Sequence, residues 1–245
     1  MSICRLEVVT AEDALDALYF FRYRIYVEEM GRPQKHADHA GRRIRDPLDD
    51  CGYNIVAWNA AGDIAGCVRV NLARHGGLEY YSDLLGLKAV GAEHPTATSV
   101  CTRLMVLPEH RRSTLATRLS CAAFDLALDH GVVWNFLDCN DHLVGFFSRM
   151  GYVRTHTAVH EEYGRVNAMR LNLRDLCHLK ATGSVFQRNL GRYHHRQRPV
   201  DLLLSQPNFS HSQPPSVADG QRGAVNRHAT ELAALVKPIC DNSLQ

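Results

Sequence analysis

Two patterns of apolar residues alternate along the first three quarters of the chain. Short runs that are continuously apolar or alternate with polar residues predict strands at 4–9, 53–58, 64–72, 99–107, 132–139, 153–159 and 167–173. Apolar residues at helical spacing predict helices from about 10 to 31, over 114–130 and over 140–151, and an amphipathic segment over 176–190. This order predicts an α/β fold with a mixed sheet.

Polar residues, Gly and Pro mark the turns and loops between these elements. Thr10 and Asp13 are spaced as a helix start, and Gly131 is typical of a helix end. Residues 59–63 predict a hairpin turn, whereas 32–52 is a long polar loop with Pro33 and Pro47. A loop of that length in a compact domain is often functional.

The character of the sequence changes after about residue 196. Five of the nine prolines lie between 199 and 238, and Ser, Gln, Asn and His replace the apolar periodicity. We therefore expect one domain over 1–195 and a flexible tail over 196–245, with a short helix at 227–237.

Composition narrows the function classes. The 28 Lys and Arg against 26 Asp and Glu give a net charge of +2, which argues against a nucleic-acid partner. The eight cysteines form no CxxC pair, and the His residues match no strong ligand spacing, so we expect reduced thiols and no metal. Because no signal segment or apolar run of about 20 residues occurs, we expect a cytoplasmic protein without membrane insertion.

Two segments carry the candidate chemistry. Residues 104–116 read as a strand that ends at Pro108 and turns into a helix through a basic loop. Such a loop directs backbone N–H groups and a helix N-terminus at one point, which suits a phosphate or pyrophosphate. The second segment holds Asn140 and Phe147 on the next predicted helix, followed by Gly151 and Tyr152.

Together these segments resemble the GNAT acyltransferase superfamily, over roughly residues 3–175. The resemblance implies a mostly antiparallel central sheet with a splayed strand pair, flanked by helices on both faces. It also implies that the splayed strand pairs with the pantetheine arm of an acyl donor while the loop amides hold the pyrophosphate. The matching donor-binding positions are Leu104, Met105, Val106, Arg111, Arg112, Ser113, Thr114, Leu115, Ala116, Asn140 and Phe147.

The sequence departs from the family pattern at two of these positions. Thr114 stands where the loop usually has Gly, and Phe147 stands where many members place the Tyr that protonates the leaving thiolate. The general acid is therefore not available at residue 147, which favours a donor other than ordinary acetyl-CoA.

The N-terminal half resembles the branch that uses acyl carrier protein, which contains autoinducer synthases and long-chain N-acyl amino acid synthases. The resemblance rests on 22–31, the acidic stretch 46–50, and the strands 66–70 and 102–106. It implies an acceptor pocket with Arg24, Asp46, Asp49, Arg69 and Arg103 as catalytic candidates. Glu29 joins Asp46 and Asp49 as a candidate base or ammonium partner, and the arginines are candidates for gripping a carboxylate. The alternative for this set is an ion-pair network with a structural role.

Two further differences bear on the acceptor. Autoinducer synthases usually carry E-x-S-R where this chain reads Val100-Cys101-Thr102-Arg103, and their Trp is missing near Pro33. These differences favour an N-acyltransferase that moves a medium- to long-chain acyl group from acyl carrier protein or acyl-CoA to an amino acid amine. The donor is then a co-substrate, and no cofactor is tightly bound.

Other interpretations stay open. They are autoinducer synthesis from S-adenosylmethionine, acetyl-CoA-dependent N-acetylation and a non-catalytic GNAT-like binding module. The basic stretch formed by Arg188, Arg192, Arg196 and Arg198 is either a solvated end or a docking surface for acidic acyl carrier protein.

Overall fold

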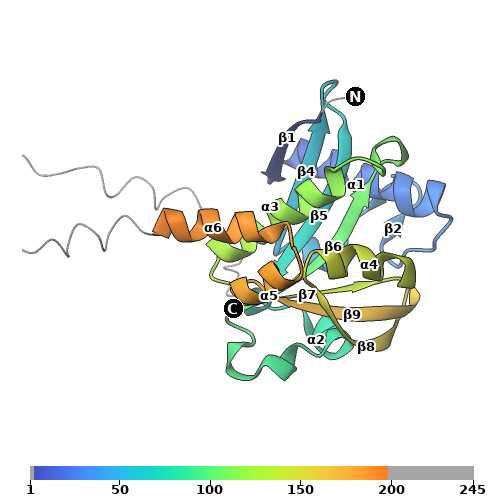
Figure 1. Ribbon diagram of the computed structural model, residues 1–245. Helices are drawn as coiled ribbons and strands as arrows, with labels where there is room; N and C mark the ends of the chain where they lie inside the picture. The colour runs from blue at the N-terminus through green and yellow to red at the C-terminus, as the bar shows by residue number, and fades with distance from the viewer. Residues whose placement is uncertain (1–2, 198–245) are drawn as a thin grey trace, which may run out of the picture. The chain divides into compact units, whose positions relative to one another are not determined.

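A seven-stranded sheet organises the chain in the computed structural model, which describes residues 3–197 (Figure 1). Its strands are β1 (Ile3–Val9), β4 (Gly52–Asn59), β5 (Ile64–Leu72), β6 (Thr98–Val106), β7 (Trp134–Cys139), β8 (Val153–His160) and β9 (Gly164–Asn172). The spatial order is β1-β4-β5-β6-β7-β9-β8, and all neighbours are antiparallel except the parallel pair β6 and β7. The predicted mixed, mostly antiparallel sheet is confirmed.

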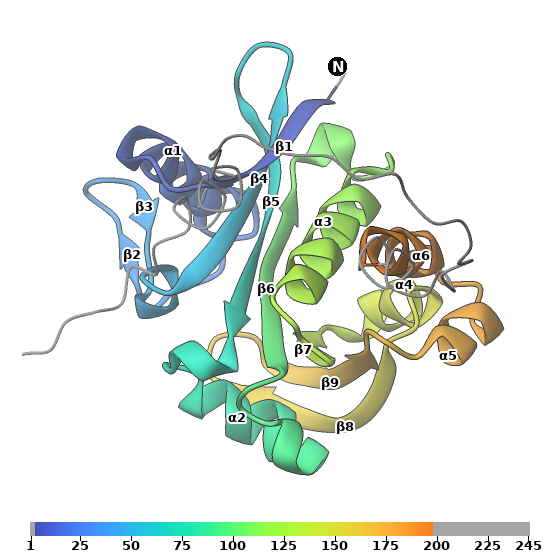
Figure 2. The same ribbon diagram turned by 90° about the vertical axis from the view of Figure 1, so that its left-hand side faces the viewer.

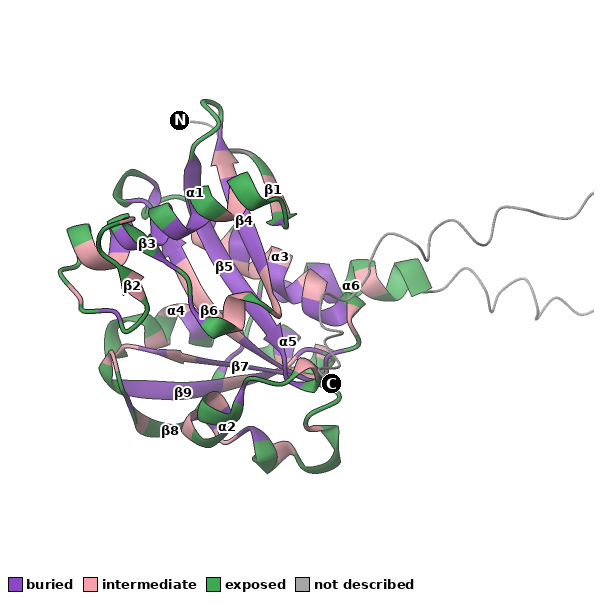
Figure 3. Cartoon of the chain, turned by 180° about the vertical axis from the view of Figure 1, so that it is seen from behind, coloured by how far each residue is buried: buried purple, intermediate pink, exposed green. Residues whose placement is uncertain are grey.

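Helices cover both faces of the sheet. They are α1 (Glu12–Tyr23), α2 (Glu79–Leu85), α3 (Leu115–Asp129), α4 (Val144–Arg149), α5 (Leu176–Ala181) and α6 (Phe186–Gln197). One large core joins apolar residues of α3 to α6 with one face of the sheet, and two smaller cores join α1 and the α2 region with the other (Figure 2). Every residue of β5 is buried, as expected for a strand covered on both sides (Figure 3).

The parallel strands β6 and β7 separate soon after they meet. They pair only from Thr98 to Val100 on β6 and from Trp134 to Phe136 on β7, although both strands continue beyond these residues. The gap beyond Val100 is the splay that the resemblance implied. It leaves one edge of the rest of β6 without a strand partner inside the sheet.

Several local expectations were wrong. The predicted cap at Thr10 is absent, because α1 begins at Glu12 after Ala11 with no side-chain cap, and α1 runs into a π-helix at Arg24–Glu29. The helix expected over 140–151 is a 3-10 turn, Asp141–Leu143, followed by the short α4, and the segment 176–190 holds two helices, α5 and the start of α6. The long loop contains a small hairpin, β2 (Ala37–Asp38) with β3 (Arg43–Ile44), and α2 was not anticipated.

Residues 198–245, with the helix predicted at 227–237 and Arg198, lie outside the described part, so that expectation stays a prediction. Within residues 3–197, no helix is both long and apolar enough to cross a bilayer. Over the same residues, no group of three or more His, Cys, Asp or Glu side chains is arranged to hold a metal ion.

Candidate active site

Five charged side chains from four segments meet on the face of the sheet that α1 covers. We call them the arginine–aspartate cluster: Arg22, Asp46, Asp49, Arg69 and Arg103. Arg22 Nη1 donates to both carboxylate oxygens of Asp49, each at 2.8 Å. Arg69 Nη1 bridges the two aspartates, at 2.6 Å from Asp46 Oδ1 and 3.0 Å from Asp49 Oδ1. Arg103 Nη2 donates to Asp46 Oδ2 at 2.8 Å.

The local backbone fixes both carboxylates. They flank the 3-10 turn Pro47–Asp49, in which Asp46 Oδ1 accepts from the Leu48 N–H at 3.0 Å and Asp49 Oδ2 accepts from the Asp46 N–H at 2.9 Å. This reciprocal capping orients the two side chains before any arginine contacts them. Gly52 is required just after the turn, because a Cβ there would lie 2.6 Å from the Leu48 carbonyl oxygen and 2.9 Å from Arg69 Cδ.

A β-bulge places Arg103. The register between β5 and β6 shifts between Cys67 and Arg69, so that β6 has one extra residue, and Arg103 takes the left-handed conformation with φ +58°. The extra residue lets Thr102 and Arg103 reach the same polar face, where the Thr102 hydroxyl accepts from Arg69 Nε at 3.1 Å. A non-glycine residue in this conformation is uncommon and often marks a functional position.

The cluster has a sealed inner part and a less enclosed outer part. Arg22 and Asp49 have no exposed side-chain surface and Arg69 has 1%, whereas Arg103 and Asp46 retain 8% and 7%. Burial alone would raise the pKa values of Asp46 and Asp49, but the guanidinium groups outweigh burial and hold both pKa values below the ordinary carboxyl range. Both aspartates are therefore ionised and engaged, which makes them poor proton acceptors.

Neutral polar groups surround the outer side of Arg103. Its Nη1 donates to Gln34 Oε1 at 2.8 Å and to the Tyr163 hydroxyl at 3.1 Å, and its guanidinium lies 5.0 Å from the Tyr26 ring centroid. The rings of Tyr26 and Tyr163 are stacked at 5.8 Å. Since the cluster has three cations and two anions, it carries one excess positive charge, and its outermost cation is Arg103. This arrangement suits the binding of a small carboxylate.

Backbone groups of Val106 face the gap between β6 and β7. The Leu107 N–H donates to the Ala65 carbonyl on the β5 side at 2.9 Å, so the N–H and C=O of Val106 face the opposite way, into the gap. Arg111 reaches this point, because its Nε donates to the Val106 carbonyl at 3.1 Å and its Nη2 lies 2.5 Å from Glu29 Oε1. The Val106 N–H is therefore positioned to stabilise negative charge on a thioester oxygen.

The basic loop leads into α3 and is open to solvent. Arg111, Arg112, Ser113 and Thr114 are exposed, whereas Leu115 is buried against the sheet and Ala116 is half-buried. The Ser113 hydroxyl accepts from the Leu115 N–H at 3.1 Å, and the following first-turn N–H groups have no acceptor within the helix. This end of α3 can receive an anion.

Phe147 and Asn140 lie beyond the other strand of the gap. Phe147 is buried, with its ring 5.8 Å from that of Tyr152, and Asn140 is half-buried just before the 3-10 turn. The Tyr152 hydroxyl donates to Asn135 Oδ1 at 2.6 Å, and Asn135 Nδ2 donates to Ser99 Oγ at 2.7 Å. These buried hydrogen bonds join β6 to β7 at Ser99 and Asn135, one pair before the pairing ends, so they hold the strands together at the apex of the gap.

Two further polar residues, Asp138 and His160, lie on the β7 side of the gap. Asp138 follows Phe136 by two residues on β7, and Phe136 packs on the α2 side of the sheet, so Asp138 shares that side. Burial raises the pKa of Asp138, against the opposing charges of His160 and Arg103. Burial lowers the pKa of His160, against the charge of Asp138.

Four of the six predicted catalytic candidates meet in the structure, and the other two lie outside their cluster. Asp46, Asp49, Arg69 and Arg103 form the cluster, Glu29 lies beside Arg111, and Arg24 is exposed outside it. Arg22, two residues earlier on α1, contacts Asp49 in place of Arg24. The side chains that the sequence prediction missed are Arg22, Tyr26, Gln34, Asn54, Thr102, Asp138, His160 and Tyr163.

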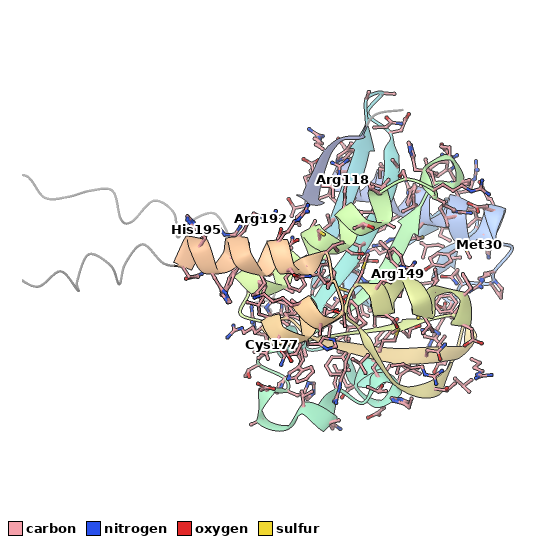
Figure 4. The ribbon with its side chains drawn as sticks, in the orientation of Figure 1. Met30, Arg118, Arg149, Cys177, Arg192 and His195 are labelled. Atoms are coloured by element: carbon pink, nitrogen blue, oxygen red, sulfur yellow. The ribbon has the colours of Figure 1, made fainter. Side chains whose placement is uncertain are left out.

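Three arginines of the predicted basic stretch, Arg188, Arg192 and Arg196, lie on α6. Arg192 and His195 are exposed along this helix (Figure 4), and Arg192 Nη2 lies 3.5 Å from Asp125 Oδ2. Its role as a docking surface stays a prediction.

Comparison with known proteins is consistent with this geometry. Residues 21–121 match the family described as an acetyltransferase (GNAT) domain. No curated protein sequence matches the chain.

Several solved structures are similar in fold. BjaI, a CoA-dependent acyl-homoserine lactone synthase solved with SAM and isopentyl-CoA, is 19% identical, with 84% of this chain and 89% of that chain covered and a TM-score of 0.57. TofI, in a ternary complex with an inhibitor and MTA, is 20% identical, with 76% and 98% covered and a TM-score of 0.57. FeeM, an N-acyl amino acid synthase from uncultured soil microbes, is 13% identical, with 70% and 90% covered and a TM-score of 0.52. The chain therefore has the GNAT fold, which confirms the predicted fold class, and the match over residues 21–121 supports the predicted enzyme class, an acyltransferase.

Proposed function

We propose that this protein is an N-acyltransferase that moves a medium- to long-chain fatty acyl group from a pantetheine thioester to the amine of an amino acid. The observation that carries the proposal is the gap between β6 and β7, with the Val106 N–H facing into it and the positively charged Arg103 beside it. A pantetheine arm needs such an unpaired strand edge. A donor phosphate fits the exposed loop before α3.

The β6 side of the gap supplies the groups for this chemistry. The acceptor amine attacks the thioester carbonyl, the Val106 N–H stabilises the oxyanion, and breaking of the C–S bond releases the thiol. Arg103, with the excess charge of its cluster, holds the carboxylate of the amino acid. The donor is a co-substrate, either acyl carrier protein or acyl-CoA, and the inner residues Arg22, Asp49 and Arg69 support Arg103 structurally.

One difference from autoinducer synthases favours an amino acid over S-adenosylmethionine. Val100 occupies the place of their E-x-S-R glutamate, and it is fully buried in an apolar cluster with Phe136 and Ala168. No carboxylate can therefore act from that position.

Mass spectrometry of lipid extracts from bacteria that express the protein tests the proposal. We expect new N-acyl amino acids with the wild type and with Lys180→Ala, an exposed control on α5, and a loss of at least tenfold with Arg103→Ala and Arg103→Lys. If soluble wild-type protein gives no amide, the proposal is wrong. Release of methylthioadenosine would instead indicate autoinducer synthesis.

A further inference from the structure

The reaction needs a proton acceptor, and the acidic residues of the cluster do not provide one. Asp46 and Asp49 are paired with arginines and have lowered pKa values, and Glu29 lies beside Arg111. An amino acid arrives mainly as an ammonium ion, which cannot attack a thioester until one proton is removed. A different group facing the gap must therefore accept that proton.

Asp138 meets this need by position. It lies on β7 two residues beyond the end of pairing with β6, on the wall opposite Arg103 and on the same side of the sheet. No arginine or lysine forms a salt bridge with it within residues 3–197, in contrast to Asp46 and Asp49. The half-buried carboxylate is thus available to a cationic ligand.

His160 supplies the second observation. The side chain is buried, with 4% exposure, and the backbone N–H of Glu162 donates to its Nδ1 at 3.1 Å. Because a backbone N–H can only donate, Nδ1 holds the lone pair, and the proton of the neutral ring is on Nε2. Nε2 is buried and has no hydrogen-bond partner among the described residues. A buried donor of this kind needs an acceptor atom.

Aromatic rings hold His160 in place. Its ring centroid lies 4.4 Å from that of Tyr163, 5.4 Å from that of Tyr80 and 6.1 Å from that of Tyr81. Tyr163 also contacts Arg103, so the turn between β8 and β9 connects His160 with the outer side of the cluster. These contacts hold the ring in one orientation.

From these contacts we infer that Asp138 and His160 belong to the acceptor pocket, with Asp138 as the catalytic base for the amine and the Nε2–H of His160 as a donor, alongside Arg103, to the substrate carboxylate. This inference rests on the proposed function. Asp138 takes one proton from the ammonium group, and the resulting amine attacks the thioester carbonyl carbon. The C–S bond then breaks, the thiolate leaves and takes up the second nitrogen proton, and the amide remains.

The pH dependence of kcat/KM separates this role from a structural one. Besides His160, the groups that face Asp138 include Arg103 on β6, Tyr80 and Tyr81 on α2, the neighbouring Cys139 and Asp138's own backbone N–H. Those that face His160 include Glu161, Glu162 and Tyr163. Burial raises the pKa of Asp138, so we expect activity to fall on the acidic side through a carboxyl pKa above the ordinary value. His160→Gln keeps an N–H donor but removes the positive charge of the protonated ring, which lowers the pKa of Asp138. The fall in activity on the acidic side should therefore move to higher pH.

The decisive experiment compares four purified variants with wild type, using an acyl-CoA and an amino acid that wild type converts. Asp138→Asn should lower kcat about 100-fold or more without lowering the unfolding midpoint, because the amide is neutral where burial disfavours charge. His160→Phe should raise KM for the amino acid at least tenfold, and His160→Gln should shift the acidic limb. His156→Phe is the control, because His156 lies on the same strand, is exposed and contacts the Leu84 carbonyl.

The outcomes distinguish this inference from the proposed function. If wild type forms no amide with any donor, the proposed function fails. If wild type is active and Asp138→Asn retains more than half of kcat, or His160→Gln leaves the limb unmoved, the subsite assignment is wrong.

Discussion

Arg22 and Arg24 show that a shift of two positions along a helix changes where a side chain points. Both precede Tyr26 on the same helical segment, yet Arg22 is fully buried against Asp49 and Asn54 whereas Arg24 is exposed. Side chains two residues apart on a helix do not face the same way. The motif match could identify the arginine-bearing stretch but not the arginine that faces the sheet.

The two positions therefore differ in their effect on stability. Arg22→Ala should lower the free energy of unfolding by about 3 to 5 kcal/mol, since it removes the bidentate partner of a buried carboxylate. Arg24→Ala should change it by less than about 0.5 kcal/mol. Urea unfolding of both variants measures the difference, and equal losses would contradict the assignment of Arg22 to the cluster.

At the scale of elements, the gap depends on where β6 and β7 stop pairing. Hydrogen bonds from Tyr152 to Asn135 and from Asn135 to Ser99 hold the strands together at the apex. The bulge at Arg103 then directs the remainder of β6. The site is thus a property of the strand pair rather than of one loop.

Tyr152→Phe tests the apex. The change leaves Asn135 Oδ1 buried without its donor, so we expect a loss of about 1 to 3 kcal/mol in the free energy of unfolding. The Tyr152 hydroxyl is buried and already donates to Asn135, so the variant should affect activity only by loosening the gap. We therefore expect KM for the acyl donor to rise by a larger factor than kcat falls. A collapse of kcat at unchanged KM would instead indicate that Tyr152 acts directly on the thiolate.

The sequence predicted the strands well, because their runs of Val, Ile and Leu are long and bounded by Gly or Pro. The resemblance also singled out the acidic stretch 46–50, although the sequence did not predict the 3-10 turn that it contains. The bulge at Arg103, the π-helix after Tyr23 and the contact of Tyr163 with Arg103 were missed, because each depends on register or on residues 60 positions apart. Asp138 and His160 were missed for the same reason, as they look like ordinary strand residues.

At the scale of the whole molecule, the buried cluster makes stability depend on acid pH. The folded-state pKa values of Asp46 and Asp49 lie below the ordinary value of about 4 in the unfolded chain, so their contribution is fully present above that value. It is lost as the pH falls from about 4 toward the folded-state values.

Denaturant midpoints at pH 7 and pH 3 check this expectation. Wild type should lose stability between these pH values, while Asp46→Asn should be less stable at pH 7 and lose less on acidification. A variant with the same pH dependence as wild type would show that Asp46 does not contribute in this way.

The central claim is that the gap between β6 and β7 brings a thioester and an amino acid amine together. The most direct test measures free thiol and N-acyl product in one reaction, with purified protein, acyl-CoA or acyl carrier protein, and a panel of amino acids. We predict equal amounts of thiol and amide, released only when both substrates are present, and reduced at least tenfold by Arg103→Lys. Thiol release without amide, or no thiol release from any donor, would contradict the account.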